Sequence, residues 1–219
     1  MKLIGKPFVS FREMETKFNK VRKELTGMGL LYDRSALDDV DCIYEVLSRD
    51  GFAAFVGVMG LYRFISDGDG NIHIPALYFA GLLPSRYEDR KILDVIRHEF
   101  GHALADRYEK HFRGSPFRPA FGANYGGTKV FRRGSWENRY VTEYATDSTQ
   151  EDFAETFMLF MKHKGKLPGR YKGRCAIEKK WEAVRQIVKE ISVLAAKESC
   201  LQSTCSRRKV NNGVKNEIT

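Results

Sequence analysis

Apolar residues recur at helical spacing along much of the chain and predict a mainly helical protein. Residues 11–26 show this spacing, and Gly27 follows as a natural helix end. A second helix is predicted after Ser35, with Gly51 closing it. Further helices are predicted over residues 85–111, 148–162 and 177–194. The apolar positions behind the first two helices are Phe11, Met14, Phe18, Val21 and Leu25, then Leu37, Val40, Ile43, Tyr44 and Leu47.

One segment has the alternation of a β-hairpin instead. In "YRFISDGDGNIHIP", residues 62–75, β-prone residues precede an Asp-Gly-Asp-Gly turn, after which Ile72 and Ile74 alternate with polar residues. Pro75 lacks the N–H group that a strand ladder needs, so the second strand is predicted at a sheet edge. The apolar residues 52–65 fit a strand or a buried helix equally well. Helices with a small sheet place the chain in the α+β class.

Composition and charge limit the classes of protein to consider. A chain of 219 residues fits one domain, and no apolar run approaches the roughly 18 residues of a membrane span. The first residues do not resemble a secretory signal, so the default location is cytoplasmic, with export without a cleavable signal as the alternative. The four scattered cysteines are predicted to be free thiols. The net charge of +9 suits an acidic partner or nucleic acid, although charge spread this evenly is typical of an ordinary solvated surface.

The stretch "HEFGH" carries the candidate chemistry. His98 and His102 lie one helical turn apart, on a different side of the predicted helix from its aliphatic stripe. Two imidazoles so placed can bind one zinc ion, and Glu99 can then reach a water on that ion. Such a site needs a third protein ligand, and the candidates are Asp106, Glu151, Asp152 and Glu155.

The candidates differ in their geometry. Asp106 continues the row of histidines along one helix, which does not surround a tetrahedral metal. Glu151 and Glu155 lie one turn apart on the next helix, so one can ligate while the other accepts the N–H of a ligating histidine. We assign Glu151 as the ligand and Glu155 as the orienting carboxylate, and the reverse assignment stays open. Ser148 and Glu151 also form a capping box, which would give this glutamate a structural role.

Together, "HEFGHA" and the downstream "EYATDSTQEDFAETF" resemble the zinc peptidase domain of anthrax lethal factor and the Pro-Pro endopeptidases of clostridia. The resemblance covers about residues 70–165. It implies a zincin-like fold, in which a small mixed sheet accompanies a helix with HEFGH and a second helix with the third ligand. It also implies the gluzincin ligand set of His98, His102 and Glu151, with Glu99 as the catalytic base. A tyrosine seven residues before the glutamate ligand contributes to catalysis in that family, and Tyr144 stands at this position.

Two hypotheses of function follow. The first is a zinc-dependent endopeptidase that hydrolyses a protein or peptide substrate, with residues 1–197 forming one domain and residues 198–219 a basic, disordered tail. The alternative is a polyanion-binding module, for example for nucleic acid, with a structural or inactive zinc site. The net charge of +9 and the basic "CSRRKVNNGVK" near the C-terminus motivate this alternative.

Overall fold

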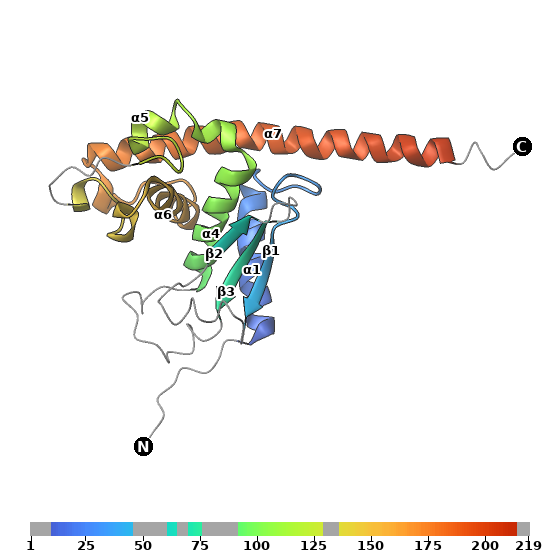
Figure 1. The fold of residues 1–219 in the computed structure, drawn as a ribbon, viewed down its shortest axis with the longest axis horizontal. Coiled ribbons are helices and arrows are strands. Elements are labelled where there is room, and N and C mark those ends of the chain that lie inside the picture. Colours follow the sequence, from blue (N-terminus) through green and yellow to red (C-terminus); the bar gives the residue numbers. More distant parts are fainter. Residues whose placement is uncertain (1–9, 46–60, 65–69, 76–91, 129–135, 214–219) are drawn as a thin grey trace, which may run out of the picture.

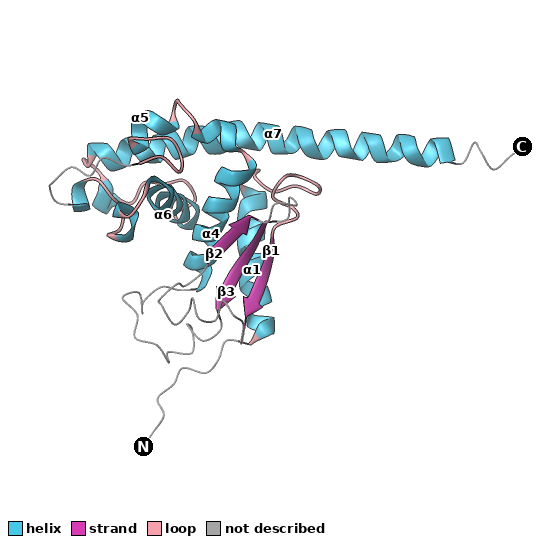
Figure 2. Cartoon of the chain, in the orientation of Figure 1, coloured by secondary structure: helices cyan, strands magenta, loops and turns pink. Residues whose placement is uncertain are grey.

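The computed structural model describes residues 10–45, 61–64, 70–75, 92–128 and 136–213 (Figure 1). Helices dominate this part of the chain and one small sheet accompanies them, so the protein belongs to the α+β class (Figure 2). The helices are α1 (Phe11–Gly27), α4 (Ile92–Arg107), α5 (Phe117–Phe121), α6 (Thr149–Lys162) and α7 (Cys175–Gly213). The strands are β1 (Asp41–Glu45), β2 (Leu61–Phe64) and β3 (Gly70–Pro75). Short 3-10 helices are η1 (Glu109–Phe112), η2 (Trp136–Asn138), η3 (Tyr144–Thr146) and η4 (Gly169–Tyr171).

Helix α1 follows its apolar pattern closely. The Ser10 hydroxyl accepts a hydrogen bond from the Glu13 amide and caps the first turn. Four residues of the predicted stripe are buried, namely Met14, Phe18, Val21 and Leu25, whereas Phe11 in the first turn is exposed. The ring of Phe18 stacks on that of Phe100 in α4 at 5.6 Å between centroids. The prediction for this helix is therefore confirmed, including its end at Gly27.

The helix predicted after Ser35 is wrong. Residues 33–39 form turns, and Asp41–Glu45 form strand β1, which pairs in parallel with β3. Leu37 and Val40 are fully buried, but they reach the core from turns instead of from a helix face. The apolar spacing was compatible with both structures, and strand pairing with β3 decided between them. Residues 46–51, the rest of this prediction, lie outside the described residues.

The predicted hairpin is confirmed in its two strands, because β2 and β3 pair antiparallel with Tyr62 opposite Ile72. Its turn, residues 65–69, and the ambiguous segment before it, residues 52–60, lie outside the described residues. However, the strand order is β1-β3-β2, so β3 is central and its predicted edge position is wrong. Pro75 is tolerated because it is the last residue of the strand, opposite Glu45 at the end of the register.

Helices α4 and α6 pack antiparallel and form the centre of the molecule. The Lys162 ammonium at the end of α6 lies 2.6 Å from the Asp94 carboxylate at the start of α4. One turn after Asp94, His98 faces Glu155, and beyond it Gly101 lies against the backbone of Ala154. Helix α4 ends at Arg107, earlier than the predicted His111, and residues 85–91 of the prediction lie outside the described residues.

Helix α6 is buried on almost every side, with α4, α5, α7 and η3 around it. Even Asp152 is fully buried, where its carboxylate lies 2.7 Å from the Lys180 ammonium of α7. Lys180 also donates to the carbonyl oxygen of Arg139 and lies over the Tyr140 ring. A buried charge pair of this kind requires its full set of partners, since either charge alone would be costly to bury. It therefore fixes how α6 sits against α7.

Helix α7 supports the body of the protein with its first half, where Trp181 is almost fully buried. Its C-terminal end extends beyond the other elements and continues to Gly213 (Figure 1). The structure thus has a helix in residues 198–213, where the sequence analysis expects a disordered tail, and that expectation stays a prediction. The division into a domain of residues 1–197 and a tail of residues 198–219 stays a prediction.

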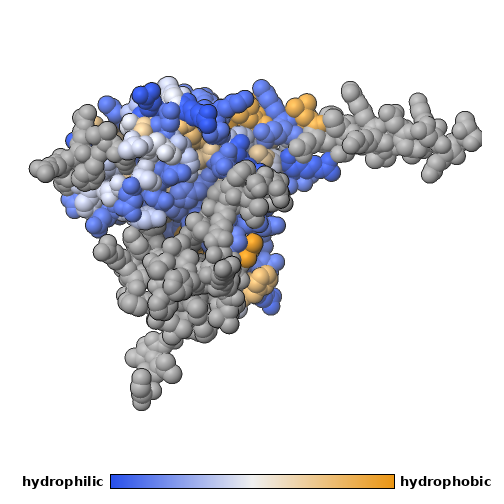
Figure 3. Space-filling view, viewed as in Figure 1, coloured by the Kyte–Doolittle hydropathy of each residue, from blue (hydrophilic) through white to orange (hydrophobic). Residues whose placement is uncertain are grey.

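The surface of the described residues is mainly hydrophilic on the face shown in Figure 3, with small separate apolar patches. No helix among these residues combines the length and the apolar character that a bilayer crossing requires. The large hydrophobic side chains that are exposed are Phe11, Tyr32, Ile43, Val193 and Leu201.

Replacing Gly101 with alanine should destabilise the protein. The new Cβ would lie 3.1 Å from the Ala154 Cα and 3.3 Å from a Phe157 ring carbon, so α4 and α6 would have to move apart. Overpacking of this kind costs about 1–3 kcal/mol, which outweighs the gain in helix propensity of about 1 kcal/mol. Gly27→Ala is the control, because its Cβ would meet nothing within 4 Å. Thermal unfolding should show a lower Tm for Gly101→Ala only, and a Tm at or above wild type for that variant would contradict the close contact.

Candidate metal centre

Three side chains from α4 and α6 converge on one point. The Nε2 atoms of His98 and His102 are 3.1 Å apart. An oxygen of Glu151 lies 3.1 Å from the first nitrogen and 3.6 Å from the second. Among the described residues, these three form one cluster of possible metal ligands, and Asp106, Asp152 and Glu155 do not belong to it.

The helix register produces this convergence. His98 and His102 are one turn apart on α4 and therefore project to the same side. Antiparallel packing brings the first turn of α6 opposite them, and the missing side chain at Gly101 lets the two helices approach closely. Glu151 belongs to that first turn.

Partners on the far side of each ring fix the orientation of the histidines. Nδ1 of His98 lies 2.7 Å from Oε1 of Glu155, and because a carboxylate only accepts, this nitrogen carries the proton. Nδ1 of His102 lies 2.7 Å from the hydroxyl of Tyr125. Each ring thus turns its Nε2 toward Glu151, as a metal-binding histidine does when its other nitrogen is held.

The distances match those of a tetrahedral zinc site. Zinc bonds to nitrogen and oxygen of about 2.0–2.2 Å in tetrahedral geometry place neighbouring ligand atoms about 3.3 Å apart. The three separations here are 3.1, 3.1 and 3.6 Å. The Glu151 oxygen in question is buried and has no hydrogen-bond partner of regular geometry among the described residues. Two imidazole nitrogens and a carboxylate oxygen are ligand types that zinc prefers, and their separations suit one ion between them, so these residues fit a zinc ion.

The electrostatics of the cluster also favour positive charge. Burial by itself lowers the pKa of His98, but the carboxylates of Glu151 and Glu155 outweigh burial and raise this pKa to about 10. For Glu151, burial raises the pKa, but the two histidines outweigh it and hold the pKa well below its usual range. The folded chain therefore stabilises an ionised Glu151 beside a cationic centre.

Glu99 and Tyr144 both lie close to this cluster. Glu99 follows His98 in α4, is buried, and its charge is one of the influences that raise the pKa of His98. Tyr144 opens η3, and its ring centroid is 5.8 Å from that of His98. The five residues predicted to take part in metal binding and catalysis thus lie in one region.

The other candidate carboxylates have different surroundings. Glu155 contacts Nδ1 of His98, on the opposite side of the ring from the converging atoms. Asp152 points to Lys180 instead. Half of the predicted capping box forms, since the Glu151 amide donates to the Ser148 hydroxyl at 3.1 Å while the Glu151 carboxylate turns to the histidines. Capping and metal binding are therefore compatible for this residue.

Two residues of the site were missed by the sequence analysis. Tyr125 contacts His102, and Thr142 donates a hydrogen bond to Oε2 of Glu155 at 2.7 Å. Both come from the segment between α4 and α6, which has no periodic pattern. The only available signal was the length of this segment, which suggested a functional loop without indicating its residues.

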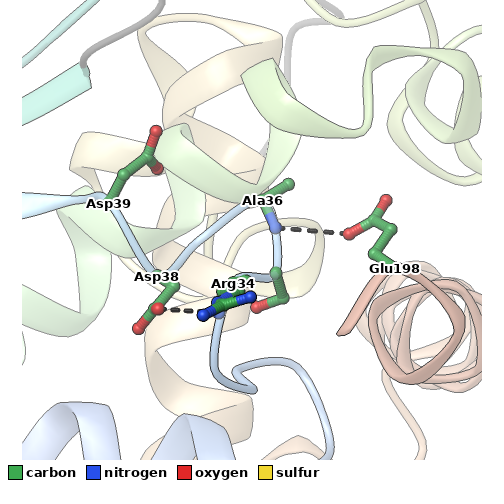
Figure 4. A pocket seen from close by; sticks show the side chains of 6 residues that line it. Arg34, Ala36, Asp38, Asp39 and Glu198 are labelled. Atoms are coloured by element: carbon green, nitrogen blue, oxygen red, sulfur yellow. Dashed lines mark hydrogen bonds between the residues drawn. The ribbon is translucent and has the colours of Figure 1, made fainter. Parts of the chain in front are cut away.

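A pocket on another part of the surface shares no residue with the cluster (Figure 4). Its carboxylates have partners, because Asp38 pairs with Arg22 and Asp39 with Arg107. Glu198 of α7 accepts hydrogen bonds from the Ala36 amide and the Tyr108 hydroxyl. The pocket thus marks where the outer part of α7 is attached to the turn at residues 33–39.

Comparison with known proteins gives one match. Residues 86–197, half of the chain, match the family model Peptidase_Mx, described as "Putative zinc-binding metallo-peptidase". The matched segment contains HEFGH, Tyr144, Glu151 and Glu155. No curated protein and no solved structure matches the chain significantly. The family match agrees with the peptidase hypothesis and gives no support to the polyanion-binding alternative.

Glu151→Ala should weaken zinc binding strongly, because it removes the carboxylate of the three-residue cluster. We expect a loss of affinity beyond the roughly 10–100-fold that follows removal of an outer contact. Asp147→Ala is the matched control, because it removes an exposed carboxylate just before the same helix. Competition with a chromophoric chelator measures both affinities. If Glu151→Ala bound zinc as tightly as wild type, Glu151 would not be a ligand.

Proposed function

The chain belongs to this family of zinc-binding metallo-peptidases, and from that premise we propose that it is a zinc-dependent endopeptidase acting on a protein substrate. The observation that carries the proposal is the convergence of His98, His102 and Glu151 at the spacing of a tetrahedral site. We propose these three residues as the zinc ligands, which would make the protein a gluzincin with a zincin-like fold. The resemblance of the two motifs to anthrax lethal factor and the Pro-Pro endopeptidases supports this ligand set.

Zinc bound there would supply a water of pKa near ~7 and polarise the scissile carbonyl group. The protein's own residues carry out the proton transfers. Glu99 would accept the proton of the attacking water and then deliver a proton to the leaving amine. Its position beside His98 on the same helix and its burial support this role, since a carboxylate shielded from bulk water is an effective acid and base.

Tyr144 is proposed to donate a hydrogen bond from its phenol to the oxyanion that forms on the substrate carbonyl. Its ring lies against His98, on the segment that leads into α6. Glu155 and Tyr125 would keep the two imidazoles in the orientation that metal binding needs. Each of these roles concerns a different atom, so single substitutions can separate them.

Glu99→Gln should abolish peptide hydrolysis and leave zinc binding intact. Loss of a general acid and base lowers kcat/KM by about 10²–10⁴-fold. The substitution keeps the shape of the side chain, and none of the proposed ligands changes. A library of quenched fluorescent peptides, followed by kinetics on the best substrate, measures the effect, with zinc content determined on the same samples.

Glu143→Gln is the control for this experiment, since it makes the same chemical change at an exposed position next to Tyr144. Full activity of Glu99→Gln would remove Glu99 from the mechanism. A zinc-loaded wild-type protein that cleaved no peptide or protein would contradict the proposed function itself.

A further inference from the structure

One hydroxyl connects the two parts of the candidate site. Thr142 Oγ1 donates to Oε2 of Glu155 at 2.7 Å and accepts a hydrogen bond from the Ala145 amide at 3.2 Å. The other oxygen of Glu155 accepts from Nδ1 of His98 at 2.7 Å. A continuous chain of hydrogen bonds therefore runs from the turn after Tyr144 to a histidine of the metal centre.

This arrangement leaves the hydroxyl little freedom. A threonine hydroxyl can donate one hydrogen bond, and here the Glu155 carboxylate accepts it. The same hydroxyl oxygen accepts a hydrogen bond from the Ala145 amide, so the orientation of the hydroxyl is fixed both as a donor and as an acceptor. Glu155 is fully buried, and a carboxylate in that position depends on its hydrogen-bond donors to stay in place.

The turn held by Thr142 is also the one that carries Tyr144. Ala145 is the next residue in η3 and is itself buried. The segment just before it is anchored from the other side, because the Tyr171 hydroxyl donates to the carbonyl oxygen of Val141 at 2.9 Å. Thr142 thus stands between a fixed backbone segment and the buried carboxylate, at the point where both halves of the site meet.

We propose that Thr142 is a positioning residue that sets His98 and Tyr144 relative to each other, acting through Glu155 and the Ala145 amide. Thr142 would affect zinc binding through the contact between Glu155 and His98. Its expected effect on turnover rests on the proposed function. Removing the hydroxyl should loosen the Glu155 carboxylate and the η3 turn together. A residue that only filled space would not produce both effects.

The test compares Thr142→Val, which removes the hydroxyl at nearly constant shape, with Thr142→Ser, which keeps it. We expect Thr142→Val to raise the zinc Kd about 10-fold and to lower kcat about 10-fold, with KM changed less than about 2-fold. Thr142→Ser should stay within about 3-fold of wild type in both quantities. Thr156→Val is the control, because Thr156 is buried next to Glu155 but donates to the Asp152 carbonyl oxygen of its own helix.

The inference is overturned if Thr142→Val matches wild type in zinc affinity and kcat, or if Thr142→Ser is as impaired as Thr142→Val. Should Thr142→Val not fold, Thr142→Cys against Thr142→Ser gives the same comparison, because a thiol is a weak donor. An active wild type with an unaffected Thr142→Val would remove only this inference. A wild type without zinc or peptidase activity would remove the proposed function, whatever the variants show.

Discussion

The close approach of α4 and α6 determines how the side chains of the candidate metal centre are arranged. Gly101 makes it achievable, since any side chain there would meet the backbone of Ala154. Once the helices lie antiparallel at this distance, His98 must face Glu155, and His102 must face the first turn of α6. The geometry of the candidate centre is thus a consequence of helix packing, not of a dedicated loop. Packed helices hold side chains in defined rotamers, which suits a site that needs accurate distances.

Several carboxylates are buried around the three converging side chains, and each of them needs partners, which explains why so many residues surround the site. Glu99, Glu155 and Asp152 are all buried in or beside this helix pair. An isolated carboxylate in such a position would be strongly disfavoured. Here Asp152 has Lys180, and Glu155 has the His98 ring and the Thr142 hydroxyl. Residues far along the chain, such as Tyr171 and Lys180, hold the segment before α6 in place. Both residues lie within the segment that matches the family model.

The sequence predicted the parts of the fold that depend on local pattern. Helix α1, the helix with HEFGH, helix α6 and the two strands of the hairpin follow from apolar periodicity and capping residues. The segment after Ser35 failed because its spacing also suits turns followed by a strand, and pairing with β3 is a non-local interaction. The predicted edge position of β3 is wrong for the same reason, because β1 pairs with β3 from a distant part of the chain. The spacing of the motifs predicted His98, Glu99, His102 and Glu151 as site residues. Tyr125 and Thr142 act through tertiary contacts that no local pattern encodes.

We propose that one zinc ion binds between α4 and α6 at His98, His102 and Glu151. Crystals of the zinc-loaded protein, measured on both sides of the zinc absorption edge, test it most directly. We predict a single anomalous peak per chain, about 2.0–2.2 Å from Nε2 of each histidine and from a carboxylate oxygen of Glu151. A peak at other residues, or no peak in protein with zinc added in excess, would contradict the claim.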